Sequence, residues 1–204
     1  MQNIREIFGD IDIYLFDQIQ KDRFAPSMKI LDAGCGGGRN LIYFMRSGCE
    51  VFAVDQNAEA IEQIRYFAKH LAPNLPSENF QIAAVENMPF PDNYFDWVIS
   101  NAVLHFAADK NQFDRMILEM WRVLKPNGAF FARLASSIGI ENLIIPTENG
   151  RYNLPDGSER FLVNEDLLIK TAENLNASFL EPIKTTNVQN LRCMTTWILC
   201  KNQE

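Results

Sequence analysis

Glycines and aspartates occur in two short stretches at spacings that can shape a binding site. The stretch "ILDAGCGGGRN" places Gly34, Gly36 and Gly38 between a short apolar run and a helical pattern. Glycines at a strand-to-helix turn let the backbone approach a ligand closely and adopt conformations that other residues avoid. Asp55 ends the next apolar run, "EVFAVD", where an acid can accept hydrogen bonds from both ribose hydroxyls or cap the following helix. The two stretches together predict a nucleoside site.

The spacing of the glycines separates three kinds of ligand. A Walker-type phosphate loop needs Lys-Ser or Lys-Thr after its glycines, and none follows here. In a dinucleotide fingerprint that starts at Gly34, the last glycine position falls on Arg39. Asp32, two residues before the first glycine, would repel a pyrophosphate and suit an ammonium group. S-adenosylmethionine carries an ammonium, a sulfonium and a carboxylate but no phosphate, and it therefore fits better than NAD.

Three basic side chains near these stretches are candidates for catalysis or ligand binding. His105, in "NAVLHF", is either a general base or a structural histidine in the wall of an acceptor pocket. Arg133 interrupts the apolar run "AFFARLA". It either faces an anionic acceptor molecule or the carboxylate of S-adenosylmethionine, the methyl donor, or it forms a structural ion pair. Arg39 is expected to pair with the donor carboxylate or with a surface acid. The four cysteines and two histidines show no metal-ligand spacing, so no metal site is predicted.

Short apolar runs alternate with helical patterns along the chain, and this alternation is expected to position the site. Near-continuous apolar runs are typical of strands covered on both faces by helices. The pattern predicts an α/β, Rossmann-like, doubly wound and mostly parallel sheet of seven strands, with a C-terminal antiparallel hairpin. The predicted strands cover residues 29–33, 50–55, 80–85, 96–101 and 129–135, the hairpin covers 177–188 and 192–201, and helices are expected at 57–69, 113–124 and 165–175.

The chain is expected to form one domain. Its predicted parts are an N-terminal helical lid, a donor-binding core, a loop or cap, and a final helix with the hairpin, at residues 1–26, 27–135, 136–163 and 164–204. Long connections in compact domains are usually functional or disordered. Acceptor choice is therefore expected in the first and third parts, which include Tyr14, Phe16, Tyr152 and Arg160, although each aromatic ring can also simply pack against the sheet.

Bulk composition restricts the partners. The net charge of −7 makes non-specific binding of nucleic acid or anionic lipid unfavourable. The N-terminal residues lack the apolar core of a signal peptide, and no apolar run is long enough for a membrane helix. Neither an "NPPY"-like motif nor a Pro-Cys pair, both typical of enzymes that modify DNA bases, is present. The sequence thus predicts a reduced, cytoplasmic monomer or homodimer that acts on a small molecule.

Four segments together resemble the class I S-adenosylmethionine-dependent methyltransferases of the small-molecule type. They are "ILDAGCGGGRN", "VFAVDQNAEAI", "VENMPFPDNYFDWVISNAVLHF" and "WRVLKPNGAFF", and they lie within residues 29–135. The glycine stretch is similar to the tellurite-resistance branch of that family. The resemblance implies S-adenosylmethionine as cofactor and methyl transfer by in-line displacement, which needs mainly proximity and alignment.

The resemblance also implies roles for residues at the methionyl and ribose groups of the donor. The backbone at Gly34, Cys35 and Gly36 would line the methionyl group, and Asp32 would hold its amino group directly or through water. Asn101, after the fourth predicted strand, would contact the methionyl group as well.

At the other end of the donor, Asp55 would bind the ribose and Gln56 would lie against the adenine. Val85 would donate its backbone N–H to the ring. Related sequences often have an Asp at the position of Ala84, and its loss is expected to weaken donor binding. Glu86 either replaces that contact or faces solvent.

Two other functions remain open. The first is a regulatory protein that binds S-adenosylmethionine or another nucleoside without chemistry. The second is an NAD-dependent oxidoreductase, against which the glycine spacing and Asp32 argue.

Overall fold

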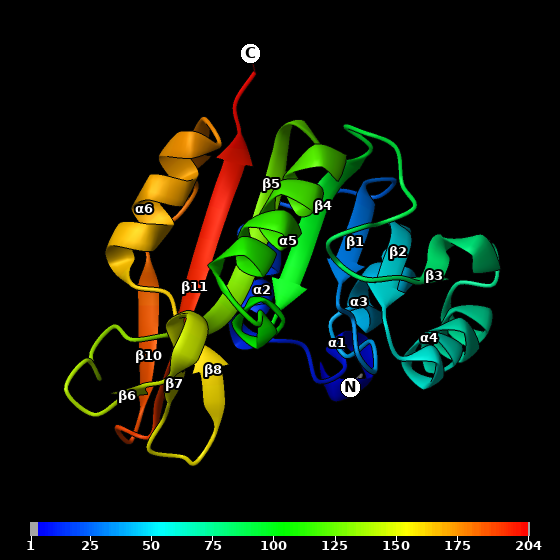
Figure 1. The fold of residues 1–204 in the computed structure, drawn as a ribbon. Helices are drawn as coiled ribbons and strands as arrows, with labels where there is room; N and C mark the ends of the chain where they lie inside the picture. The colour runs from blue at the N-terminus through cyan, green and yellow to red at the C-terminus, as the bar shows by residue number, and fades with distance from the viewer. Residues whose placement is uncertain (1–3, 204) are drawn as a thin grey trace.

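The structure, a computed structural model, describes residues 4–203, and its centre is a twisted sheet (Figure 1). The strand order is β10-β11-β5-β4-β1-β2-β3, and a short eighth strand, β9, pairs with β11. Strands β1 to β5 run parallel, and β11 is antiparallel to β5, β9 and β10. Their bounds are β1 Lys29–Ala33, β2 Glu50–Asp55, β3 Phe80–Ile82, β4 Phe95–Asn101, β5 Leu124–Ser136, β9 Ala177–Phe179, β10 Lys184–Val188 and β11 Arg192–Lys201. The expected mostly parallel sheet with a C-terminal antiparallel hairpin is confirmed.

Helices cover both faces of the sheet because successive strand residues are buried on opposite sides. On β1, Leu31 packs in the apolar cluster that contains residues of α5 and α6, whereas its neighbour Ile30 packs in the cluster that contains residues of α2, α3 and α4. The helices are α1 Ile4–Phe8, α2 Ile13–Gln20, α3 Ile42–Arg46, α4 Ala58–Leu71, α5 Lys110–Val123 and α6 Glu165–Asn174, with short 3-10 turns η1 Ser77–Asn79, η2 Leu104–Phe106 and η3 Glu148–Gly150.

Strands β1, β2 and β11 have their predicted limits, and the others differ. β4 begins one residue early, at Phe95, and the predicted strand 177–188 is divided into β9 and β10. β3 ends at Ile82, three residues before the predicted end. β5 begins at Leu124 and includes the "KPNG" stretch that was expected to be a break. The strand continues through it because Asn127 adopts a positive φ of 62° and the pairing with β4 shifts register beyond Phe95; such bulges accommodate extra residues in a ladder.

The segment expected as a loop over residues 136–163 contains a small antiparallel sheet, which we call the cap (Figure 1). It consists of β6 Ile145–Pro146, β7 Arg151–Asn153 and β8 Glu159–Phe161. The ring of Phe161 stacks on Phe113 of α5 with centroids 5.1 Å apart. The cap is therefore fixed to the main body by apolar packing. The part boundaries at residues 26, 135 and 163 stay predictions.

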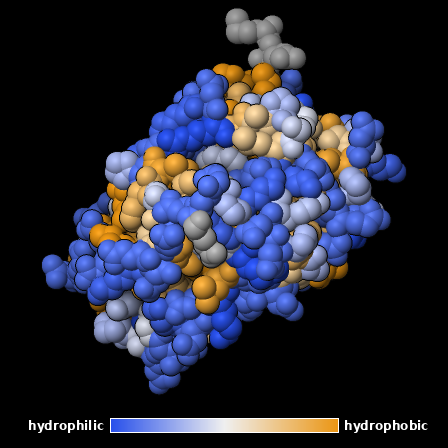
Figure 2. All heavy atoms as spheres, turned by 90° about the horizontal axis from the view of Figure 1, so that it is seen from above, coloured by the Kyte–Doolittle hydropathy of each residue, from blue (hydrophilic) through white to orange (hydrophobic). Residues whose placement is uncertain are grey.

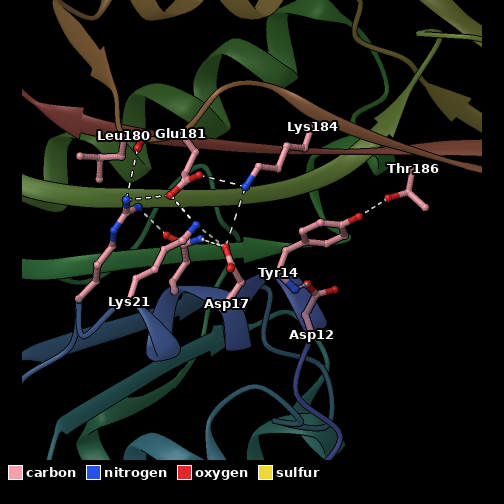
Figure 3. A network of polar contacts seen from close by, with 10 residues as sticks. Asp12, Tyr14, Asp17, Lys21, Leu180, Glu181, Lys184 and Thr186 are labelled. Atoms are coloured by element: carbon pink, nitrogen blue, oxygen red, sulfur yellow. Dashed lines mark hydrogen bonds and ion pairs between the residues drawn. The ribbon is translucent and has the colours of Figure 1, made fainter.

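The N-terminal helix α2 is tied to the C-terminal part of the chain by polar contacts (Figure 3). Lys21 bridges Asp17 at 2.7 Å and Glu181 at 2.8 Å, and Glu181 also pairs with Lys184 at 3.0 Å. The hydroxyl groups of Tyr14 and Thr186 are hydrogen-bonded. Residues far apart in sequence thus hold α2 against the sheet, which makes this segment an anchored element in the structure.

On the face seen in Figure 2, hydrophilic side chains cover most of the surface and hydrophobic ones form smaller patches between them. Among the described residues, no helix combines the length and apolar character needed to cross a membrane.

Candidate functional site

A cavity of about 710 Å³ lies at the carboxyl ends of β1, β2 and β4. In open α/β sheets, this is the edge where ligands bind. We call it the donor cavity, and most of the residues predicted to bind the donor line it. They are Gly34, Cys35, Gly36, Arg39, Asp55, Gln56, Val85, Glu86 and Asn101. Strands far apart in sequence therefore bring these predicted residues together.

The glycine turn is tightly packed on one side and open on the other. The N–H groups of Gly34 and Cys35 donate to the carbonyl of Val54 at 2.8 and 3.0 Å. Gly34 has a φ of +81°, and a Cβ atom there would lie 2.5 Å from Cγ2 of Val103. Gly36 also has a positive φ, +49°, but a Cβ there would meet nothing within 4 Å. The turn therefore requires glycine at Gly34 for packing, and it leaves space above Gly36 on the cavity side.

The carboxylate of Asp55 braces this turn. Its Oδ2 accepts from the N–H of Gly36 at 2.8 Å, and its Oδ1 accepts from the N–H of Asn57 at 2.9 Å. Asn57, not Asp55, caps α4, because its side chain accepts from the N–H of Glu59. The helix-capping alternative for Asp55 is therefore wrong. A carboxylate has about four lone-pair positions, and two of those on Asp55 remain for a ligand.

Asp32 lies beneath the turn and does not line the donor cavity. It is 1% exposed, and its Oδ2 is sealed from solvent with no hydrogen-bond partner among the described residues. Burial raises the pKa of Asp32 to about 7, and the nearby positive charge of Arg39 opposes this rise. An unpaired buried acceptor is costly, so this carboxyl group suits a cationic partner that the protein itself does not provide.

Asn101 provides a complementary unpaired donor. Arg39 Nη2 donates to Oδ1 of Asn101 at 3.3 Å, which leaves the amide Nδ2 of Asn101 buried without a partner in the described part of the chain. Because a guanidinium has only donors, this contact fixes the orientation of the amide. Arg39 is half exposed and lies 3.8 Å from the buried carboxylate of Asp12. The acid that it meets in the protein is thus buried, which differs from the surface acid of one predicted alternative; the other, pairing with the donor carboxylate, stays a prediction.

Several residues that line the donor cavity are missed by the sequence reasoning. Gln112, at the start of α5, donates from Nε2 to Oε1 of Glu86 at 2.9 Å and so holds Glu86 at the cavity wall. Val103, Phe106 and Met116 supply apolar wall. Val103 and Phe106 lie close to His105 in the sequence, and Met116 is on the buried face of α5. These positions could have suggested a role in the site, but no motif assigns one to them.

His105 lines a second, smaller cavity of about 260 Å³ rather than the donor cavity, and Ala102 borders both. The Nδ1 of His105 accepts from the backbone N–H of Ala135 at 3.1 Å. Burial, helped by the charges of Arg160 and Arg192, lowers the pKa of His105 to about 4. Its other nitrogen, Nε2, therefore carries a proton at neutral pH, which argues against the predicted role of general base.

Arg133 also lines the second cavity and forms the ion pair that was one of its two predicted roles. Its Nη1 lies 2.8 Å from Oδ2 of Asp12. Asp12 is buried and caps α2 by accepting from the N–H of Tyr14. The charge of Arg133 is thus balanced within the protein.

Of the four residues expected to select the acceptor, three pack against other side chains and one lines a cavity. The ring of Tyr14 lies under the guanidinium of Arg133, 5.2 Å from its carbon, and Phe16 packs edge-on against Phe8 at 4.8 Å. Tyr152 packs in the apolar cluster of the cap, whereas Arg160 lines the second cavity. None of residues 4–26 lines either cavity; residues 1–3 of the predicted lid lie outside the described residues.

Comparisons with known proteins agree with this geometry. Residues 31–132 match the family described as "Methyltransferase domain". The chain is 31% identical over 117 residues to an uncharacterized methyltransferase of Synechocystis, covering 56% of this chain and 51% of that protein. It is 38% identical over 123 residues to the human thiol S-methyltransferase TMT1A, covering 57% of this chain and 47% of that protein.

A solved structure shows the same fold. It is the 1,6-didemethyltoxoflavin-N1-methyltransferase of Burkholderia thailandensis, with its substrate and S-adenosylhomocysteine bound, at a TM-score of 0.72 and 16% identity over 96% of this chain and 80% of that one. The chain spans about half the length of the two curated relatives. With half of its residues matched, the chain belongs to the methyltransferase domain family, the class I S-adenosylmethionine-dependent methyltransferases, and S-adenosylmethionine is the cofactor of this family.

Proposed function

We propose that this protein transfers the methyl group of S-adenosylmethionine to a small-molecule acceptor by in-line displacement. The observation that carries the proposal is the pair of unsatisfied buried groups beside the glycine turn. Oδ2 of Asp32 needs a donor and Nδ2 of Asn101 needs an acceptor. An α-amino acid group offers both, since its ammonium donates and its carboxylate accepts. Arg39, at the same wall, adds a positive charge for that carboxylate.

The remaining donor contacts are proposed from the cavity lining. Backbone atoms of Gly34, Cys35 and Gly36 would contact the methionyl chain, because the space above Gly36 is open. Asp55 would accept from the ribose hydroxyls with the lone pairs that its two backbone contacts leave free. Because Asp32 lies below the turn, its contact with the ammonium requires a water molecule or a small movement of the turn.

For the adenine, we propose Gln56 against one face of the ring and the backbone N–H of Val85 on its edge, as both residues line the cavity. Ala84 cannot supply the acceptor that related sequences place there. Glu86 is held at the wall by Gln112, and its second carboxylate oxygen is the acceptor that we propose for the adenine amino group.

The sulfonium supplies an already activated methyl group, so the protein must mainly align the acceptor and exclude water. His105 presents a protonated Nε2, and the guanidinium of Arg133 has only donors, so neither suits the role of general base. We therefore propose that both position the acceptor. An acceptor that ionises in water, such as a thiol, or that attacks without losing a proton fits such a site. We also propose, from the cysteine content alone, that the protein works in the cytoplasm.

Calorimetric titration tests the donor site. S-adenosylmethionine and S-adenosylhomocysteine are expected to bind the wild type with micromolar affinity, and NAD is not. Asp55→Ala should weaken binding roughly 10- to 100-fold, because a charged hydrogen bond contributes about 1.5–3 kcal/mol. The matched control is Glu62→Ala, which removes an exposed carboxylate of α4. Silence toward both sulfur nucleosides contradicts the proposal, and binding without turnover across a wide acceptor panel favours a regulatory protein.

A further inference from the structure

The second cavity is lined by an unusual concentration of positive charge. Arg133 of β5, Arg160 of β8 and Arg192 at the start of β11 all line it, together with His105 of η2. The cavity adjoins the donor cavity at Ala102, which borders both. The main sheet, the cap and the connection after β4 thus bring these side chains together beside the place where the donor methyl group is expected.

The charges in this cavity do not cancel. Arg133 is paired with Asp12 at 2.8 Å, and Arg192 lies 3.5 Å from Asp156, an acid that also lines the cavity. Arg160 has no carboxylate within ion-pair distance among residues 4–203; its Nη1 donates to the carbonyl of the preceding residue. A net positive charge therefore remains at Arg160, in a cavity whose other walls are partly apolar. Such a site favours an anion.

His105 adds a neutral donor to the same wall. The hydrogen bond from Ala135 occupies its Nδ1, so the proton of the neutral ring is on Nε2. Phe106, the next residue, is 58% exposed, lines the donor cavity and lies under the guanidinium of Arg160 at 4.8 Å. An apolar surface thus leads from the donor cavity to the positive group.

We propose that the second cavity binds an anionic oxygen group, a carboxylate or a phosphate, at one end of the methyl acceptor, with Arg160 as the main anchor. Arg192 and the Nε2–H of His105 would complete the contacts. The apolar body of the acceptor would lie along Phe106, and its nucleophilic atom would reach the donor cavity past Ala102. This inference deepens the proposed function and rests on it for the identity of the molecule as an acceptor.

Ligand-observed NMR titration tests the anion site without requiring turnover. The probes are benzoate, phenyl phosphate and benzamide, added to protein saturated with S-adenosylhomocysteine and, separately, to protein without it. At least one of the anions is expected to bind about tenfold more tightly than benzamide, as expected for a charge-assisted contact. Arg160→Gln should abolish this preference, and Arg160→Lys should retain part of it. Arg46→Gln, which removes an exposed charge of α3, should leave it unchanged.

The outcomes separate the two proposals. Tighter binding of benzoate assigns a carboxylic acid as the acceptor class, and tighter binding of phenyl phosphate assigns a phosphate ester. Equal binding of benzamide and both anions, or an anion preference that survives Arg160→Gln, overturns the inference. Calorimetry with S-adenosylhomocysteine on the wild type and on each variant keeps the two proposals apart. No donor binding in the wild type counts against the proposed function, whereas a missing anion preference with donor binding intact counts against the anion site alone.

Discussion

The donor cavity and the second cavity lie side by side, yet they are built in different ways. The donor cavity is formed mainly by residues at the ends of three parallel strands, so that β1, β2 and β4 each present one short stretch at the same sheet edge. The second cavity takes its arginines from β5, β8 and β11 and its histidine from η2, which no repeating unit relates. Its electrostatic balance also depends on Asp12, from the N-terminal segment.

This difference indicates that the two cavities are constrained in different ways. A donor common to a whole family can be bound by backbone geometry, which the sheet order fixes. An acceptor is selected by individual side chains, here drawn from strands of the main sheet and from the cap. We therefore expect mutations near the donor cavity to act through backbone strain and buried polar groups, and mutations near the second cavity to act through charge.

The largest expected effect is at the ion pair that joins the N-terminal segment to the second cavity. Asp12→Ala should lower the free energy of unfolding by about 3–5 kcal/mol, because it leaves Arg133 as an uncompensated, largely buried charge. Asp17→Ala removes an acid of the same helix region that is 37% exposed, and it should cost about 0–1 kcal/mol. Urea denaturation measures both values (Figure 3 shows the two aspartates). Similar losses in the two variants would show that the pair is not structural.

A second comparison sets the glycine turn against the cap. Gly34→Ala combines a positive φ with a Cβ only 2.5 Å from Val103, whereas Gly157→Ala has a similar φ of +82° and open space. In Gly157→Ala, the free energy of unfolding should therefore fall only by the cost of the backbone conformation, about 1–2 kcal/mol. The turn variant should lose a further 1–3 kcal/mol, roughly, from overpacking. Chemical denaturation of both variants is the measurement, and an equal cost would mean that the turn can move away from Val103.

The titration of His105 is expected to change the free energy of unfolding by up to about 3 kcal/mol. The folded protein holds its pKa at about 4, below the ordinary 6.5, chiefly because the ring is buried. The unfolded chain therefore binds a proton at this residue first as pH falls, so His105 lowers the stability between pH 6.5 and pH 4. This contribution opposes that of Asp32, whose pKa the fold raises to about 7. In His105→Gln this part of the pH dependence should disappear. A variant with the same slope as the wild type would show that other groups cause it.

The smallest expected effect is at Asn101. Asn101→Ala removes the unpaired Nδ2 and should weaken the binding of S-adenosylhomocysteine roughly 2- to 10-fold, the value of one ordinary hydrogen bond. Asn187→Ala, on the exposed hairpin formed by β10 and β11, is the control and should leave affinity unchanged. An unchanged affinity in Asn101→Ala would remove this residue from the donor site.

The fold could largely be predicted from the sequence, because buried parallel strands are continuous apolar runs with clear ends. β1 and β2 have the predicted limits. The strands of the cap could not be predicted, since β6, β7 and β8 have only two or three residues each, too few to show an alternating pattern. The extension of β5 through "KPNG" was hidden for another reason: its residues usually break regular structure.

The candidate site shows the same division. The residues of the donor cavity could be identified because they follow strand ends within recognisable stretches. The partner of Arg133 could not, because Asp12 is 121 residues away in sequence and resembles any other acid near a helix start. The tautomer of His105 depends on one hydrogen bond from Ala135 of the neighbouring strand, and spacing in the sequence carries no information on such a contact.

The most direct test of the central claim is to count the protons released when S-adenosylhomocysteine binds. Asp32 is protonated below its raised pKa of about 7, and the ligand ammonium should ionise it. Calorimetry at pH 6 in two buffers of different ionisation enthalpy should therefore detect the release of about one proton on binding. The Asp32→Asn variant should release none. In the wild type, the affinity for the ligand should fall about tenfold per pH unit below pH 7. Tight binding without proton release would contradict the assignment of Asp32 to the amino group of the donor.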